Sequence, residues 1–320
     1  MDRNLALEVV RVTEATALAS ARFMGRGDRA TADRAAAEAM RRAFQDIAVN
    51  AEVVIGQGEE RAPVLHAGDR VGRGRDGDVE IEVAVDPLEG TTLCAQGAPG
   101  AMSVIAMGEK GRLLRPPETD LEKIVVGPGA KGVVDLGKPV SENLRRIADA
   151  LGKYLEDLTV VVLDQPRHEP LLEEVRRAGA RIKLIQGGGV AGSLATCFPE
   201  TGVDVLVGVG GASEGVVTAA AVRCAGGDLQ ARFRFRSDAE RDGARAGGLR
   251  EPARILSAED LAGGSVMFAA TGVTNGDILK GVRFTGQGAR TPSVVMRSRT
   301  GTVRFIETVH RFQRFPDYGW

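Results

Sequence analysis

Apolar, strand-like runs alternate with amphipathic stretches through the second half of the chain, and this alternation is the strongest constraint on its fold. Each run is rich in valine, isoleucine or leucine, and each amphipathic stretch repeats its apolar residues at helical spacing. Strands that alternate with helices are typical of an α/β protein with a largely parallel sheet. The predicted strands are 158–164, 181–186 and 203–211, and the predicted helices start at His168, Gly187 and Ser213.

The first half mixes helical and antiparallel patterns. Residues 5–24 have the spacing of a helix, and Thr31 is a plausible N-cap of a second helix, which would place Asp33 in its first turn. Residues 101–114 are predicted to form a hairpin that turns at 109–111. Because the pattern changes near Leu158, we predict two domains. These are an α+β domain, 1–156, and an α/β domain, 157–320.

Local composition predicts three further segments. Ser141 would cap a helix that runs to Ala150. Residues 237–251 are polar, charged and glycine-rich, which predicts a solvated loop. A strand at 265–274 and a hairpin that turns at 300–301 are predicted to close the chain.

Composition and charge exclude several classes of function. The 320 residues include 42 basic and 43 acidic side chains, so the net charge of −1 provides no overall field for nucleic acid or an anionic membrane. No apolar run is long enough to cross a membrane. The cysteines, Cys94, Cys197 and Cys224, lack metal-binding or disulfide spacing, which favours a reducing, cytoplasmic environment.

Residues 83–92, with the sequence VAVDPLEGTT, have the composition of a combined metal and phosphate site. A buried strand, 83–85, leads to Asp86 and Glu89, and Pro87 is expected to end the strand because it lacks an N–H. Carboxylates are the hard oxygen ligands that magnesium and manganese prefer, and a glycine with hydroxyls at a helix start favours an anion. The alternative interpretation is an ordinary capped turn.

Two more acids have a similar setting. Asp33 lies near a helix start, and Glu214 opens a helix directly after a glycine-ended strand. With Asp86 and Glu89 they form a candidate set of metal ligands. Spacing alone does not bring the four together, and acids at helix starts also serve as caps.

Other motifs allow both a functional and a structural interpretation. Arg167 and His168 follow a predicted strand end, where α/β proteins bind ligands, so they suit a phosphate clamp; the alternative is a helix cap and a surface arginine. Residues 187–192 match a dinucleotide-binding pattern with Asp204 downstream, but the match is weak because it does not open a first βαβ unit. The alternating segment 231–236 is interpreted as an edge strand protected by charge.

A series of segments, in order along nearly the whole chain, resembles the class II fructose-1,6-bisphosphatase family of the lithium-sensitive sugar and inositol phosphatase superfamily. The resemblance implies a layered αβαβα sandwich, a cytoplasmic homo-oligomer, and Mn²⁺ or Mg²⁺ as cofactor. It also implies hydrolysis of the 1-phosphate of fructose 1,6-bisphosphate, or of a related sugar such as sedoheptulose 1,7-bisphosphate. The segments are RVTEATALASARFMGRGD, TADRAAAEAM, VVIGQGE, VDPLEGTT, EKIVVGPGAKG, PRHE, VDVLVGVGGASEGVV and FAATGVTNGDIL.

Carried over position by position, the resemblance implies roles for the residues described above. Paired metal ions would orient the attacking water, with help from the hydroxyl of Thr91, and neutralise charge on the phosphoryl oxygens. The implied metal ligands are Asp33, Asp86, Glu89 and Glu214. The residues that would face the phosphate are Glu89, Gly90 and Thr91, and those that would bind the rest of the sugar phosphate are Arg167, His168 and Gly211.

The chain departs from the family pattern in the loop at 56–61. Gln57 replaces a metal-binding glutamate, and an amide lacks the charge that holds a hard cation. The loop is one residue shorter than in the family, so Glu60, with Glu59 second, is the candidate acid that polarises the water. We hypothesise that one of these glutamates rotates into the vacated metal position. The competing hypothesis is a paralogue that binds sugar phosphates or a partner with little turnover.

Positions that contact the substrate in the family also differ. Asp120 stands in place of a tyrosine, Gln165 in place of a lysine, and Gly187–Gly189 in place of an Asp-Gly-Asp run. The resemblance therefore implies that several substrate contacts have changed.

Overall fold

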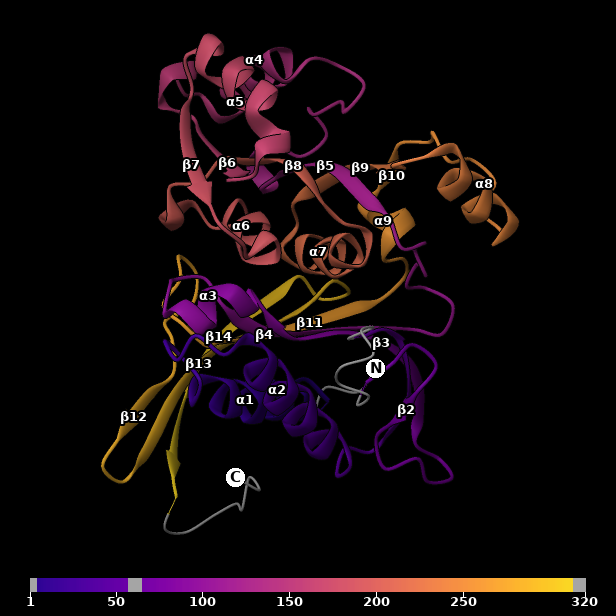
Figure 1. The fold of residues 1–320 in the computed structure, drawn as a ribbon, viewed down its shortest axis with the longest axis vertical. Helices are drawn as coiled ribbons and strands as arrows, with labels where there is room; N and C mark the ends of the chain where they lie inside the picture. Colours follow the sequence, from indigo (N-terminus) through magenta and orange to yellow (C-terminus); the bar gives the residue numbers. More distant parts are fainter. Residues whose placement is uncertain (1–4, 57–64, 313–320) are drawn as a thin grey trace. The chain divides into compact units, whose positions relative to one another are not determined.

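The computed structural model describes residues 5–56 and 65–312, and its contacts divide the chain into two compact units (Figure 1). Unit 1 comprises Met1–Leu113 and Gly264–Trp320, and unit 2 comprises Leu114–Gly263. This division does not coincide with the predicted boundary between residues 156 and 157. The reason is that β11 (Val266–Gly272) pairs antiparallel with β4 (Met102–Gly108), which returns the end of the chain to the sheet of the first half.

Unit 1 is built on an eight-stranded mixed sheet. Besides β4 and β11, its strands are β1 (Val49–Ile55), β2 (Arg70–Val71), β3 (Val79–Glu89), β12 (Arg283–Thr285), β13 (Gly288–Arg297) and β14 (Thr302–Arg311). The order is β12-β13-β11-β4-β3-β1-β2, and β14 also pairs with β13. β1 and β3 are parallel, and the other pairs are antiparallel. The hairpin of β13 and β14 confirms the predicted turn at 300–301.

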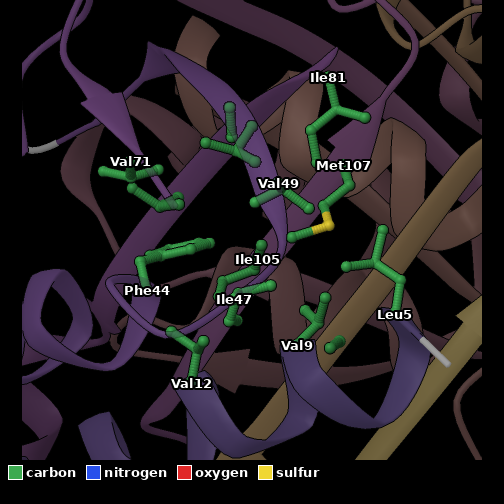
Figure 2. Close-up of a cluster of buried hydrophobic side chains, with 14 of the residues drawn as sticks. Leu5, Val9, Val12, Phe44, Ile47, Val49, Val71, Ile81, Ile105 and Met107 are labelled. Atoms are coloured by element: carbon green, nitrogen blue, oxygen red, sulfur yellow. The ribbon is translucent and has the colours of Figure 1, made fainter. Parts of the chain in front are cut away.

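Two helices, α1 (Leu5–Ala21) and α2 (Arg29–Phe44), pack on one face of this sheet (Figure 1). The helical spacing of Leu5, Val9 and Val12 predicts a buried face, and all three side chains are buried. Figure 2 shows them gathered with Phe44 and Ile105 in the apolar core of the unit. Each such side chain stabilises the fold by about 1.5–3 kcal/mol when fully buried. A short helix, α3 (Thr91–Gln96), follows β3.

Unit 2 contains a six-stranded mixed sheet in the order β10-β9-β5-β8-β6-β7. Its strands are β5 (Asp120–Val126), β6 (Thr159–Leu163), β7 (Arg181–Ile185), β8 (Val205–Gly211), β9 (Asp228–Arg234) and β10 (Leu256–Ser257). The predicted strands of the second half are thus confirmed as β6, β7 and β8. The predicted largely parallel sheet is only partly correct. β6 is parallel to β7 and β8, but β5 lies between β8 and β9 and is antiparallel to both.

Helices cover both faces of the unit 2 sheet. α4 (Val140–Leu151) and α5 (Glu169–Ala178) lie on one face, whereas α6 (Gly189–Ala195), α7 (Ala212–Ala225) and α9 (Ala258–Leu261) lie on the other (Figure 1). An apolar cluster that includes Leu144, Val175 and Val207 fills the first interface. The remaining elements are α8 (Asp238–Ala246) and the 3₁₀ turns Pro128–Ala130, Leu155–Asp157, Pro166–His168 and Pro199–Thr201.

Two helix starts differ from the predicted ones. α2 begins at Arg29, because the side chain of Asp28 caps it by accepting the N–H of Thr31 at 3.0 Å. Thr31 is therefore not the N-cap, and Asp33 lies beyond the first turn. α4 begins at Val140 after Pro139, so Ser141 is not its cap either.

Three longer segments also differ. The predicted hairpin at 101–114 is wrong, because the chain leaves β4 and next forms β5 in the sheet of unit 2. The predicted loop at 237–251 contains α8, which the side chain of Ser237 caps at the N–H of Glu240. Segment 231–236 is an edge only in part: β10 pairs with Ala231, whereas Arg232–Arg234 of β9 pair with β5 alone.

In the part of the chain that the structure describes, nine α-helices and two mixed sheets make this a mixed α/β protein. None of the described helices is long and apolar enough to span a membrane.

Candidate active-site residues in each unit

The turn between β3 and α3 shapes the candidate site of unit 1. β3 continues through Pro87 to Glu89, so the prediction that Pro87 ends the strand is wrong; instead, the register with β4 shifts between Asp86 and Glu89. Gly90 then adopts a left-handed backbone with φ 81°. A Cβ at Gly90 would also lie 3.1 Å from Leu93 and 3.3 Å from Ala101, so only glycine suits this turn.

Thr91, the first residue of α3, is bound to Asp33. Its Oγ1 lies 2.5 Å from Oδ1 of Asp33 and 3.0 Å from the carbonyl oxygen of Leu88. Both neighbours are acceptors, so the Thr91 hydroxyl donates its proton to them. Asp33 reaches this position from α2, which packs against α3. The contact joins residues 58 positions apart in the sequence.

Two acids at the end of β3, Asp86 and Glu89, lie on either side of the register shift. Asp86 is half-buried, and its Oδ1 accepts the N–H of Leu88 at 3.2 Å, which orients the carboxylate. Glu89 is 3% exposed. Together with Asp33, they offer the hard oxygen donors that suit Mg²⁺ or Mn²⁺. Nevertheless, no three Asp, Glu, His or Cys side chains within residues 5–56 and 65–312 already form a metal-binding cluster.

Cys94 is buried close to this turn. Burial, with the nearby Asp33 carboxylate, raises the pKa of the Cys94 thiol to about 11. The thiol is therefore protonated at neutral pH. Cys197 and Cys224 are buried as well, and none of the three described cysteines forms a disulfide.

In unit 2, Glu214 in the first turn of α7 forms an ion pair with Lys123 of β5. The ammonium group of Lys123 is completely buried, whereas the Glu214 side chain is 27% exposed. Two glycines make room for the pair. A Cβ at Gly189 would come within 2.1 Å of Oε1 of Glu214, and one at Gly210 would lie 3.3 Å from both charged groups. Sequence reasoning missed Lys123, although a lysine inside the apolar run LEKIVV was a usable signal.

Arg167 and His168 both bind the backbone of Val209 in β8. Nη2 of Arg167 donates to the carbonyl oxygen of Val209, and Nε2 of His168 accepts its N–H, each at 2.9 Å. Nδ1 of His168 lies 2.9 Å from the carbonyl oxygen of Leu163, so the buried ring is neutral, with its proton on Nδ1. Burial also lowers the pKa of His168. The ring thus ties the end of β6 to β8, beyond their last paired residues, Val161 and Leu206.

Arg167 also forms an ion pair with Asp120, at 2.9 Å between Nη1 and Oδ2. Asp120 begins β5 and pairs with Gly211 of β8, so the carboxylate stands beside another predicted substrate residue. Asp204, in contrast, is structural: its carboxylate binds Lys153 at 2.5 Å and the N–H of Thr159 at 2.9 Å. Because both carboxylate oxygens of Asp204 are bound within the protein, Asp204 is a poor candidate for a ribose contact, which argues against a dinucleotide site.

The sequence pattern of the family described as "Bacterial fructose-1,6-bisphosphatase, glpX-encoded" matches residues 3–310. The chain belongs to this family. A D-fructose 1,6-bisphosphatase class 2/sedoheptulose 1,7-bisphosphatase from Synechococcus elongatus is 42% identical over 336 residues, which cover 98% of this chain and 97% of the relative. A protein of the same description from Synechococcus sp. strain JA-3-3Ab is 42% identical over 334 residues, 97% of this chain and 96% of the relative.

Membership of the class II fructose-1,6-bisphosphatases confirms the predicted family and enzyme class, a phosphatase of carbohydrate metabolism. Within unit 1 the structure brings Asp33 to Thr91 and places the acids of β3 on the same turn. Within unit 2 it brings Arg167 and His168 to β8, next to Gly211. Predictions for Gln57, Glu59 and Glu60 lie outside the described residues.

Proposed function

We propose that this class II enzyme hydrolyses the 1-phosphate of fructose 1,6-bisphosphate, giving fructose 6-phosphate and phosphate, and that sedoheptulose 1,7-bisphosphate is the nearest alternative substrate. The observation that carries the proposal is the turn that joins Glu89, Gly90 and Thr91 to Asp33. The names of the relatives, which include both sugars, support the choice of substrates.

In this proposal, the carboxylates that would hold divalent cations are those of Asp33, Asp86, Glu89 and Glu214. When bound, Mn²⁺ or Mg²⁺ lowers the pKa of a water molecule and neutralises charge on the phosphoryl oxygens. Because the Thr91 hydroxyl donates its hydrogen bond to Asp33, its oxygen is left to accept a hydrogen bond from the attacking water. That hydrogen bond orients the water toward phosphorus. Gly90 permits close approach of the phosphate because it carries no side chain.

The rest of the sugar phosphate is assigned to unit 2. Arg167 and the backbone at Gly211 would bind its distal part, because a guanidinium group is the residue of choice for phosphate. Both ring nitrogens of His168 are already bonded to backbone groups. We therefore assign His168 a positioning role: it holds the 3₁₀ turn that carries Arg167. A layered αβαβα sandwich, a homo-oligomer and a cytoplasmic location belong to the same proposal.

The proposal predicts metal-dependent phosphate release from a small set of sugars. The purified protein, incubated with Mn²⁺ or Mg²⁺, is expected to release phosphate from fructose 1,6-bisphosphate and sedoheptulose 1,7-bisphosphate, and to stop when a chelator removes the metal. Colorimetric phosphate measurement on a panel of sugar phosphates tests this. Absence of metal-dependent release from every sugar bisphosphate would favour the binding paralogue instead.

The acids near Gln57 provide a second test. If Glu59 or Glu60 supplies the charge that Gln57 lacks, Glu59→Gln or Glu60→Gln should lower metal-dependent activity by about tenfold or more, and should raise the Mn²⁺ concentration for half-maximal activity. Gln57→Glu should then change activity little. A steep gain with Gln57→Glu, and no loss with either glutamine variant, would show that the loop has lost its metal function.

A further inference from the structure

Asp120 faces Arg167 at the position where the proposed function places the distal phosphate. We propose that Asp120 is a specificity-determining residue: by neutralising Arg167, it weakens recognition of the distal phosphate of a sugar bisphosphate relative to the phosphate that is hydrolysed. The proposal rests on the proposed function in one respect, the assignment of Arg167 to the distal phosphate.

The guanidinium group of Arg167 has two anchors in unit 2. Nη1 donates to Oδ2 of Asp120 and Nη2 to the carbonyl oxygen of Val209, both at 2.9 Å. The side chains of Arg167 and Asp120 are 41% and 32% exposed, so a solute can reach both. The Asp120 carboxylate already neutralises the guanidinium charge. A phosphate that approaches Arg167 therefore competes with Asp120 for this group.

The backbone around Asp120 keeps this approach open. Asp120 pairs with Gly211, and a Cβ built on Gly211 would have no atom within 4 Å. An anion that uses Arg167 and the backbone at Gly211 must consequently lie near the Asp120 carboxylate. The negative charges of the phosphate and the Asp120 carboxylate repel each other at this short distance. Because the Asp120 side chain is only partly exposed, solvent screens this repulsion only in part.

The second anchor determines the sign of the expected effect. If Asp120 were the sole contact of Arg167, removing its charge would release the side chain and weaken binding. When Asp120 changes, Nη2 of Arg167 still donates to the carbonyl oxygen of Val209. Val209 is itself held in place because its N–H donates to Nε2 of His168. Loss of the carboxylate charge is therefore expected to strengthen phosphate binding.

Asp120→Asn tests the proposal, because it removes the charge and keeps the shape. The matched control is Glu122→Gln: Glu122 lies two residues along β5, is 27% exposed, and pairs with Arg232 at 2.8 Å. Fructose 6-phosphate, which carries only the distal phosphate, is titrated calorimetrically into each Mn²⁺-loaded protein. We expect about threefold to tenfold tighter binding to the Asp120→Asn variant and less than about twofold change in the Glu122→Gln variant, in line with the modest worth of exposed charge pairs.

Turnover provides the specificity measurement. In the Asp120→Asn variant, kcat/KM for fructose 1,6-bisphosphate should rise by about the same factor, mainly through KM, while kcat/KM for fructose 1-phosphate stays constant. Adding Arg167→Gln to Asp120→Asn should abolish the gain in fructose 6-phosphate affinity. Unchanged or weaker fructose 6-phosphate binding by the Asp120→Asn variant would overturn the proposal. So would an equal gain for both substrates. Failure of the unmodified protein to hydrolyse any sugar phosphate would instead refute the proposed function, and the calorimetric comparison would still decide the role of Asp120.

Discussion

Replacing Thr91 with valine is expected to lower kcat for sugar bisphosphate hydrolysis by about 10²-fold, the usual cost of misplacing a reacting group by about 1 Å. Valine keeps the volume of the side chain but removes the hydroxyl that bonds Asp33 at 2.5 Å. The attacking water would then lose the group that orients it. Initial-rate measurements at saturating Mn²⁺ test the effect, and KM should change much less than kcat.

The neighbouring threonine offers a matched control. Thr92 is the next residue of α3, and its hydroxyl accepts a hydrogen bond from Arg29 at 3.2 Å instead of contacting an acid. Thr92→Val should therefore retain activity within about threefold, because its hydroxyl contacts none of the proposed site residues. Thr91→Ser, which restores a hydroxyl, should recover most of the rate. If Thr91→Val is as active as Thr92→Val, the hydroxyl of Thr91 takes no part in the reaction.

Replacing Lys123 with methionine is expected to destabilise the protein by about 3 kcal/mol, the lower end for a broken buried ion pair. The Lys123 ammonium is fully buried, so its charge is tolerated only because Glu214 neutralises it. Without it, Glu214 keeps a carboxylate that is 27% exposed and partly hydrated, which moderates the loss. The transition temperature should fall by about 6–12 °C for a unit of this size, measured by calorimetry.

Two further variants separate buried charge from packing. The double variant Lys123→Met, Glu214→Gln leaves no unpaired charge and should regain much of the stability, although it would lack a proposed metal ligand. Lys138→Met removes an exposed partner of Glu142, with side chains 51% and 44% exposed, and should cost less than about 0.5 kcal/mol. Equal destabilisation by Lys123→Met and Lys138→Met would contradict the argument from burial.

Local features of the fold were predictable because they depend on neighbouring residues. The strands β6, β7 and β8 and the helices between them follow from apolar runs and helical spacing. Errors arose where two residues compete for one local role. Asp28 and Thr31 are both good caps, and the geometry of the turn before α2 selects Asp28.

Strand pairing was not predictable in the same way. β5 is not among the strands predicted above, yet it inserts between β8 and β9 and makes the sheet mixed. β11 returns from the far end of the chain to pair with β4. These choices depend on contacts between distant segments, and a strand's own sequence carries little information about its partner.

The sequence by itself determined the family, and with it the chemistry to expect from Asp86, Glu89 and Thr91, because these residues occur within one short motif. Only the tertiary structure decided which groups are neighbours. Asp33 accepts the hydrogen bond of the Thr91 hydroxyl. The buried Lys123 forms an ion pair with Glu214, and Asp120 forms one with Arg167. The physical reason is that charge pairing and burial act through space, across separations of 58, 91 and 47 residues that no local pattern records.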